Sequence, residues 1–267
     1  MAELNLRMTR AWALNAVEQA MALAQADRSW GSETHPVGDG SLILSGPDMY
    51  VNRAMAVGIG KEVSGDDLDF IAWRCRLMDV QPEFEVTALT LPGTVERLKV
   101  HGFVPDSGSQ VTALSRYVHG PDIDAPDDLV VRQVTCQADL TLWQEVSASG
   151  WGHVDARARS VSDAFTAAAY VTDKDGMMIA FEKNSERPVG CASVTIRDRL
   201  ATLGGMSTHP DHRRRGVQAA LVRHRLLLAA QRGCEYAVAT CVTDGASERN
   251  LSRHGFRPKF SVQTWKS

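Results

Sequence analysis

Residues 209–221 read His-Pro-Asp-His-Arg-Arg-Arg-Gly-Val-Gln-Ala-Ala-Leu, and this stretch decides the fold of the second half of the chain. It follows an apolar, strand-like segment at 200–208 and opens a helix-like segment at 217–232. The first turn of a helix has N–H groups without intrahelical partners, and its dipole favours negative charge. Gly216 lets a ligand approach the backbone closely, and the three arginines before it suit phosphate. The stretch therefore predicts an anion site between a strand and a helix.

The remainder of the second half alternates strands with helices. Hydrophobic periodicity and turn residues predict strands at 129–133, 176–182, 189–196, 200–208, 236–242 and 260–265, and helices at 139–149, 160–171, 217–232 and 246–254. A polar turn at 183–187 joins two of these strands into a hairpin. Strands that alternate with helices and also form antiparallel hairpins indicate a mixed α/β sheet.

The first half is less regular. Its pattern predicts helices at 5–27, 64–78 and 94–100, a Gly/Pro/Ser-rich loop over 31–49, and strands at 41–44, 55–59, 85–91 and 111–117. Residues 121–128 are acidic, contain two prolines and have almost no apolar content, which is typical of a linker. We therefore expect one domain at 1–120, a linker at 121–128 and a second domain at 129–267.

The two halves share a short sequence echo. The pattern Leu98-x-x-His-Gly-Phe-Val-Pro recurs as Leu251-x-x-His-Gly-Phe-Arg-Pro. In each half the pattern follows a strand-like segment and reads as a short helix, Gly-Phe and a strand. Chance is one explanation, because glycine commonly ends helices. The matching order of elements favours a duplication in which the first copy has lost its basic turn.

Composition limits the classes of function. The 267 residues suit two domains, and 44% hydrophobic with 23% charged residues is ordinary for a soluble protein. A net charge of -3 does not favour nucleic acid, and no apolar run is long enough to span a bilayer. The five cysteines are scattered, without a Cys-x-x-Cys pair, so we expect buried, reduced thiols in a cytoplasmic protein.

The second half resembles the GCN5-related N-acetyltransferase (GNAT) family. That family carries Gln/Arg-x-x-Gly-x-Gly/Ala after its central strand, and 213–219 reads Arg-Arg-Arg-Gly-Val-Gln-Ala, with Gln218 where a small residue is usual. His209-Pro210 before this motif and Gly255-Phe256 near the C-terminus are similar to two further family motifs. The resemblance covers about 129–267 and implies a mixed, mostly antiparallel sheet flanked by helices. It also implies two similar domains in tandem, the first of them degenerate.

The resemblance implies acetyl-CoA as the donor and a set of residues that bind it. The pantetheine amides would pair with the backbone of Met206, Ser207 and Thr208 on a strand that splays from its neighbour. The pyrophosphate would lie on the N–H groups of the turn, and Asn250 would lie along the cofactor. The predicted turn residues are Arg213, Arg214, Arg215, Gly216, Val217, Gln218 and Ala219.

The implied reaction is direct attack of an amine on the thioester in a ternary complex. The N–H of Met206 is the expected donor to the oxyanion. Relatives place a tyrosine acid where this chain has Leu251, and some place a glutamate base where it has Thr202. Thr202 could at most hold a water molecule, and Ser252 is a further candidate for proton transfer. Cys241 and His209 are also near the motifs in sequence, and water-mediated transfer is the more cautious hypothesis.

Several other residues have two interpretations. Trp151 could contact the acceptor or belong to the core. His209 and His212 have a spacing that a metal site could use, but on a Pro-containing turn we expect solvent-exposed histidines and no metal. Arg223 and Arg225 are expected to be solvated or to cap the helix.

The leading interpretation is an N-acetyltransferase that acts on a primary amine, with a small molecule as acceptor, no nucleic acid or membrane partner, and a homodimer left open. The second is a non-catalytic CoA-binding regulator or scaffold, which the absent tyrosine and glutamate would suit. The third is an enzyme of the same fold that acts on another acyl thioester. The sequence does not name the acceptor.

Overall fold

The computed structural model describes residues 2–47, 49–118, 123–153 and 155–267. Its internal contacts divide the chain into two compact units. The first unit comprises the residues up to Leu114 together with Thr240–Asn250 and Pro258–Ser267. The second unit comprises Ser115–Ala239 and Leu251–Arg257. Two C-terminal segments therefore pack with the first half of the chain. A division of the sequence at 121–128 would assign both segments to the second half. Residues 121 and 122 of the expected linker lie outside the described residues.

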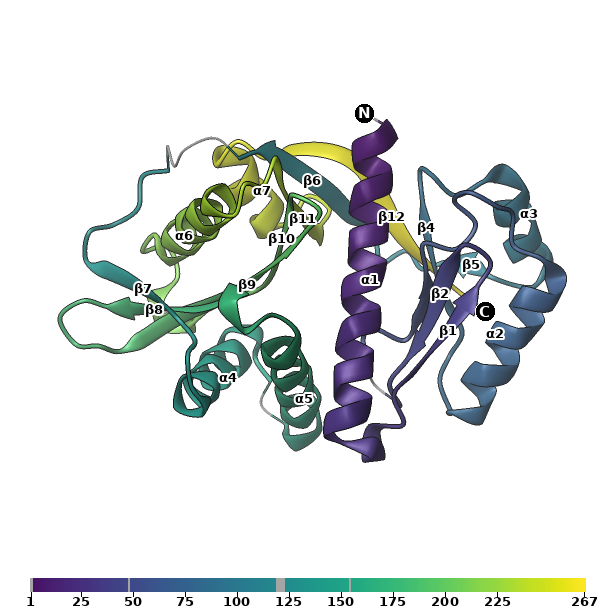
Figure 1. Ribbon diagram of the computed structural model, residues 1–267, viewed down its shortest axis with the longest axis horizontal. Helices are drawn as coiled ribbons and strands as arrows, with labels where there is room; N and C mark the ends of the chain where they lie inside the picture. Colours follow the sequence, from purple (N-terminus) through teal and green to yellow (C-terminus); the bar gives the residue numbers. More distant parts are fainter. Residues whose placement is uncertain (1, 48, 119–122, 154) are drawn as a thin grey trace. The chain divides into compact units, whose positions relative to one another are not determined.

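The first unit is a sheet covered by helices on both faces (Figure 1). Its strands follow the order β1-β2-β3-β4-β12, and β5 also pairs with β12. The strands are β1 (Glu33–Val37), β2 (Gly40–Leu44), β3 (Arg53–Met55), β4 (Glu83–Thr87), β5 (Val104–Pro105) and β12 (Arg257–Lys266). The helices are α1 (Ala2–Ala26), α2 (Gly65–Leu77), α3 (Pro92–Val100) and the 3-10 turn η1 (Arg28–Trp30).

The core of the first unit lies between the sheet and helices α2 and α3. Leu42, Phe84 and Leu98 are fully buried there, and Trp265 of β12 joins them. Because side chains alternate along a strand, Ile43 points to the other face, which α1 covers. Helix α2 begins at a capping box, in which the Ser64 hydroxyl accepts from the backbone N–H three residues later.

The second unit has the strand order β7-β8-β9-β10-β11, and helices pack on both of its faces (Figure 1). Strand β6 (Val111–Tyr117), like β11, runs from one set of residues into the other. The strands are β7 (Leu129–Gln133), β8 (Met177–Glu182), β9 (Pro188–Arg197), β10 (Leu200–Thr208) and β11 (Tyr236–Val242). The helices and 3-10 turns are α4 (Gln137–Trp151), α5 (Ala156–Asp173), η2 (Lys174–Gly176), η3 (Pro210–His212), α6 (Val217–Gln231) and α7 (Ala246–Arg253), of which Leu251–Arg253 belong to this unit.

The two units repeat one order of pairing. Strands β1, β2 and β3 pair antiparallel, and β3 then pairs parallel with β4 after helix α2. Strands β8, β9 and β10 likewise pair antiparallel, and β10 pairs parallel with β11 after α6. The sequence echo falls at matching places, because the N–H of Phe103 donates to the Leu98 carbonyl and that of Phe256 to the Leu251 carbonyl. These observations support a duplication, and the mixed α/β sheet that the sequence predicts is present.

Three predictions for the first half are wrong in detail. The strand expected at 85–91 is β4, which ends at Thr87. The expected loop at 31–49 contains strand β1, although Pro36 lies in it. Proline is tolerated there because β1 is the last strand of the sheet order, where a backbone donor can be spared. The expected strand at 55–59 ends at Met55, because the chain turns through Ala56 and Gly58 with positive φ angles.

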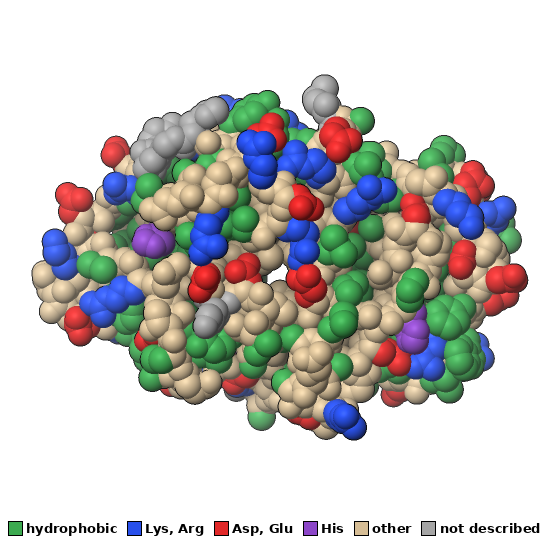
Figure 2. Space-filling view, in the orientation of Figure 1, with side chains coloured by type: hydrophobic (Ala, Val, Ile, Leu, Met, Phe, Trp, Pro, Cys, Tyr) green, Lys and Arg blue, Asp and Glu red, His purple; other side chains and the backbone are tan. Residues whose placement is uncertain are grey.

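The distribution of charge, the helices and the cysteines can be compared with what the composition predicts. Acidic and basic side chains are interspersed on the face drawn in Figure 2, in keeping with the small net charge. In the part of the chain that the structure describes, no helix is both long and apolar enough to cross a lipid bilayer. Four cysteines are buried as expected, whereas Cys136 is exposed at the start of α4.

The first unit also buries a carboxylic acid. Glu85 on β4 is buried, and its Oε1 has no hydrogen-bond partner among the described residues. Burial raises the pKa of Glu85 to about 7, although the positive charge of Arg53 opposes the shift. The folded protein therefore holds a proton on Glu85 at pH values where the unfolded chain, with an ordinary pKa of 4.5, has released it.

We predict that Glu85→Gln removes a pH-dependent loss of stability. Because the folded pKa lies above the unfolded one, the contribution of Glu85 is fully present below pH 4.5 and is lost as the pH rises through about 7. The wild type should therefore lose up to about 3 kcal/mol relative to the variant between pH 4 and pH 8. Urea denaturation across this range measures the difference. Glu83→Gln, on the same strand but partly exposed beside Lys266, is the matched control, and parallel curves for E85Q and the wild type would contradict the prediction.

Candidate functional site

The centre of the candidate site is an irregularity in strand β10. Gly204 pairs with Ser193 of β9, but the next paired residue on β10 is Ser207, opposite Cys191. Gly205 and Met206 therefore lie together opposite the single residue Ala192, and Gly205 adopts a φ of 52°. This is a β-bulge, which re-aims the backbone groups of the residues within it. The Gly204-Gly205 pair in the sequence is the signal that could have predicted it.

On its other side, β10 parts from β11. The two strands pair in parallel only from Leu200 to Thr202, opposite Tyr236 to Val238. Both strands continue for several residues beyond this point, yet no further pair joins them in the described residues. Met206, Ser207 and Thr208 thus follow the parting of the strands, as the predicted splay requires. The N–H of Met206 also belongs to the bulge, where the register between β10 and β9 shifts.

The bulge is packed from both faces of the sheet. On the α4 face, a Cβ built on Gly205 would lie 3.3 Å from the ring of Trp143, whose indole N–H donates to the Ala192 carbonyl at 3.2 Å. On the α6 face lies Arg225, which is 1% exposed. The expectation that Arg225 is solvated or caps the helix is therefore wrong, whereas Arg223 is exposed. Arg225 is followed by four apolar residues, Leu226 to Ala229, but Arg223 and His224 precede it, so the local sequence does not mark it as buried.

The basic turn connects β10 to α6. Gly216 is the N-cap of α6, with a φ of 76°, and helix α6 begins at Val217. The backbone N–H groups of Arg214, Arg215, Gly216, Val217 and Ala219 have no acceptor among the described residues. The N–H of Arg213 differs, because it donates to the Pro210 carbonyl at 3.3 Å. Free N–H groups at a helix start, on the positive end of its dipole, can hold an anion.

The three arginine side chains of the turn have different partners. Arg213 donates to the Gly150 carbonyl at 2.9 Å and so ties the turn to the end of α4. Arg215 forms an ion pair of 3.0 Å with Glu182 on β8. Arg214 is exposed, has a φ of 62°, and makes no hydrogen bond or ion pair within the described residues. Arg214 is therefore the cation best placed to meet a ligand on this turn.

A buried histidine stabilises the turn from beneath. His212 is 5% exposed, and its Nδ1 lies 3.3 Å from Glu182 and 3.1 Å from a guanidinium nitrogen of Arg215. The expectation of a solvent-exposed histidine is thus wrong for His212. Burial lowers the pKa of His212 in spite of the nearby carboxylate. The hydroxyl of Ser185, with the positive charges beside it, lowers the pKa of Glu182. Within the described residues no group of three or more His, Cys, Asp or Glu side chains could hold a metal ion.

The other predicted residues are only partly brought together. Thr202 is half-buried at the last pair between β10 and β11. Leu251 is buried on α7, and Ser252 next to it is half-buried. Asn250 belongs to the segment Thr240–Asn250 of the first unit, so it is not part of the unit that holds the turn. Cys241 belongs to that segment as well.

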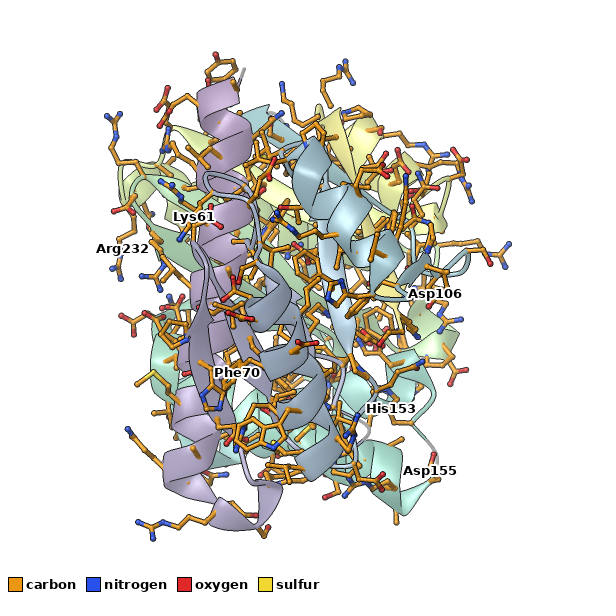
Figure 3. The ribbon with its side chains drawn as sticks, turned by 90° about the vertical axis from the view of Figure 1, so that its right-hand side faces the viewer. Lys61, Phe70, Asp106, His153, Asp155 and Arg232 are labelled. Carbon is orange, nitrogen blue, oxygen red and sulfur yellow. The ribbon has the colours of Figure 1, made fainter. Side chains whose placement is uncertain are left out.

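Trp151 is not a core residue. It is the last residue of α4, and it is 60% exposed. The chain passes from there through His153 and Asp155, both labelled in Figure 3, into α5. Asp155 accepts from the backbone N–H of Ala158 at 2.7 Å and so helps to begin α5. Of the two interpretations of Trp151, its exposure favours contact with an acceptor over a place in the core.

The first unit has a turn at the matching place, but this turn is already filled. After β3, the carboxylate of Asp39 accepts from the backbone N–H groups of Gly58, Gly60 and Lys61. Lys61 is labelled in Figure 3. The carboxylate lies where an anionic ligand would have to bind, and the acidic residues Asp66 and Asp67 open the helix that follows. Asp39 therefore occupies three N–H groups of the first turn, whereas no carboxylate of the described residues accepts from the N–H groups of the second turn.

Comparison with known proteins finds one family model that matches part of the chain. Residues 141–256 match the model of the acetyltransferase (GNAT) family. No curated protein matches the chain in sequence. The matched residues include the bulge of β10, the basic turn and all of α6.

Solved structures share the fold at low sequence identity. A GCN5-related N-acetyltransferase from Kribbella flavida is 18% identical, with a TM-score of 0.65 over 94% of this chain and 95% of that one. A tandem GNAT protein of the clavulanic acid biosynthesis pathway is 16% identical, with a TM-score of 0.63 over 85% and 77%. A GCN5-related N-acetyltransferase from Sphaerobacter thermophilus is 16% identical, with a TM-score of 0.59 over 75% of this chain and 65% of its own length.

Replacement of Gly216 tests how closely the turn is built. In Gly216→Ala, the new Cβ would lie 2.4 Å from Cγ of Pro126, and alanine would also adopt a positive φ. In Gly233→Ala, at the other end of α6, the φ of 70° gives a similar strain but no atom lies within 4 Å. The strain costs about 1–2 kcal/mol in each variant, and we expect G216A to lose at least about 1 kcal/mol more. Urea denaturation measures both, and equal losses would contradict the predicted contact with Pro126.

Proposed function

Because residues 141–256 match the model of the GNAT acetyltransferase family, we propose that the chain transfers an acetyl group from acetyl-CoA to a primary amine of a small molecule. The observation that carries this proposal is the course of β10. The strand parts from β11, forms a bulge at Gly205 and Met206, and leads within a few residues to free N–H groups at the start of α6. Acetyl-CoA has an extended pantetheine arm with amide groups, followed by a pyrophosphate. The order of these groups matches the order of the splayed strand and the turn.

The residues present fit acetyl-CoA. The pantetheine amides would pair with the backbone of Met206, Ser207 and Thr208, which have no strand partner on the β11 side in the described part of the chain. The pyrophosphate would accept from the N–H groups of Arg214, Arg215, Gly216, Val217 and Ala219, and the Arg214 guanidinium would add charge. The N–H of Arg213 contributes less to this proposal than the sequence suggests, because the Pro210 carbonyl already accepts from it.

The proposed reaction forms one bond and breaks one. The nitrogen lone pair of a neutral amine attacks the thioester carbonyl carbon, and the resulting oxyanion accepts from the N–H of Met206. The C–S bond then breaks, so that the electron pair leaves on the CoA sulfur. The amine proton passes through water to solvent or to the thiolate. Leu251 is apolar and buried, so it cannot act as the acid that many relatives have at this position. Thr202 carries only a neutral hydroxyl, so it cannot act as the base that some relatives have there.

Two observations extend the proposal to the acceptor and to the first unit. The exposed ring of Trp151 offers an apolar surface for an acceptor. In the first unit, the Asp39 carboxylate occupies the N–H groups of the matching turn, which supports one acetyl-CoA per chain. We further propose a cytoplasmic location, since each of the five cysteines is a free thiol.

A regulator or scaffold that binds CoA without catalysis is the second candidate. The apolar Leu251 and the uncharged Thr202 favour it, because they stand where proton-transfer groups are usual. An enzyme that acts on another acyl thioester is the third candidate. Mass spectrometry of the CoA ester that copurifies with the chain distinguishes the third candidate from the first.

The test is titration of the full chain with acetyl-CoA in a calorimeter, followed by thiol release with a panel of primary amines. We expect one site per chain and amine-dependent thiol release. The exposed Cys136 would react with a thiol reagent, so the release assay uses a Cys136→Ser background. Gly216→Ala should bind acetyl-CoA at least about tenfold more weakly, since a displaced turn loses hydrogen bonds to a charged ligand, while Gly233→Ala should match the wild type. Absence of acetyl-CoA binding would refute the proposal, and binding without thiol release from any amine would favour the regulator.

A further inference from the structure

Arg225 is the largest side chain that is fully buried in the described residues. It lies on α6, between the apolar neighbours Leu221, Leu226 and Leu228. Removing a guanidinium from water costs several kcal/mol unless its donors are satisfied. An apolar residue of similar length could fill this space without that cost. The guanidinium must therefore contribute something that packing alone does not require.

The donors of Arg225 converge on the bulge of β10. One terminal nitrogen, Nη1, lies 3.4 Å from the Gly204 carbonyl and 3.2 Å from the carbonyl of Ser193, the residue paired with Gly204. The other, Nη2, lies 3.1 Å from Sδ of Met206. Nε donates to the Leu221 carbonyl at 3.2 Å, which fixes the guanidinium against its own helix. The planar guanidinium therefore contacts Gly204 before the bulge, Ser193 opposite Gly204, and Met206 within the bulge.

The other face of the sheet prevents the bulge from relaxing away from Arg225. Trp143 packs against Gly205 there, and its indole is fixed by the Ala192 carbonyl. The two bulge residues are thus held between an aromatic ring and a guanidinium. Neither β9 nor β11 pairs with these two residues. Contacts from α4 and α6 therefore hold the bulge at a point where the strand register shifts.

We propose that Arg225 is a positioning residue for the oxyanion donor. By holding the Gly204 carbonyl and the Met206 side chain, it fixes the peptide between Gly205 and Met206 and so the direction of the Met206 N–H. The proposal rests on the proposed function, in which that N–H donates to the thioester carbonyl. A misdirected donor would leave acetyl-CoA bound through the turn and the pantetheine, but would no longer polarise the carbonyl.

The test reads the carbonyl directly and needs no acceptor. Acetyl-CoA labelled with ¹³C at the thioester carbonyl is bound to the full chain, and its carbonyl stretch is recorded by difference infrared spectroscopy. A hydrogen bond to the carbonyl lowers this frequency, so we expect a lower value on the wild type than in water. Arg225→Gln should lose more than half of that shift while its acetyl-CoA Kd, measured by calorimetry, stays within about threefold of the wild type. Arg225→Lys keeps a charge but not the fork and should give an intermediate shift.

Matched variants separate positioning from packing. Arg223→Gln changes an exposed arginine one helical half-turn earlier and should match the wild type in shift, Kd and thermal stability. Met206→Leu removes the sulfur contact and keeps Arg225, so it should lose part of the shift; it carries the test if Arg225→Gln fails to fold. A full shift in folded R225Q or in M206L would overturn the positioning role. A wild-type chain that binds no acetyl-CoA would instead refute the proposed function.

Discussion

The parting of β10 from β11 after Thr202 is the constraint on which the rest of the second unit depends. A strand within a sheet is normally paired on both sides, so backbone groups without a strand partner need another source of order. Here the order comes from helices. The ring of Trp143 and the guanidinium of Arg225 hold the bulge from opposite faces, and the N–H groups and carbonyls of the splayed edge remain available to a ligand.

Helix α6 links the two ends of the candidate donor site. Its first residue, Val217, belongs to the turn that offers free N–H groups, and Arg225 lies eight residues later at the bulge. At the rise of an α-helix this separation is about 12 Å, so one rigid element sets the distance between the anion site and the bulge. Glu182 and the buried His212 stabilise the start of this element through Arg215. A displacement of α6 would therefore move both parts of the site together.

The sequence predicts the parts of the site that local patterns encode. The strand at 200–208, the basic turn and the helix start at Val217 each carry a local signal, and the structure has all three. Contacts between distant residues were missed. The burial of Arg225 and His212 depends on β9 and β8, which the sequence around these residues does not specify. Strand β1 was missed because Pro36 reads as a loop unless the strand is known to be the edge. The pairing of β12 with β4 joins residues far apart in the chain, and no local pattern encodes it.

The two turns show opposite solutions to one physical problem. Backbone N–H groups that are left unsatisfied at a tight turn cost free energy. In the first unit the chain satisfies three of them itself, through the carboxylate of Asp39. In the second unit these N–H groups have no acceptor among the described residues. Arg214 lies beside them and adds a positive charge that favours an external anion. An anionic ligand that accepted from these N–H groups would therefore stabilise the second turn. A turn of this kind is suited to binding, whereas the first turn is suited to holding its own unit together.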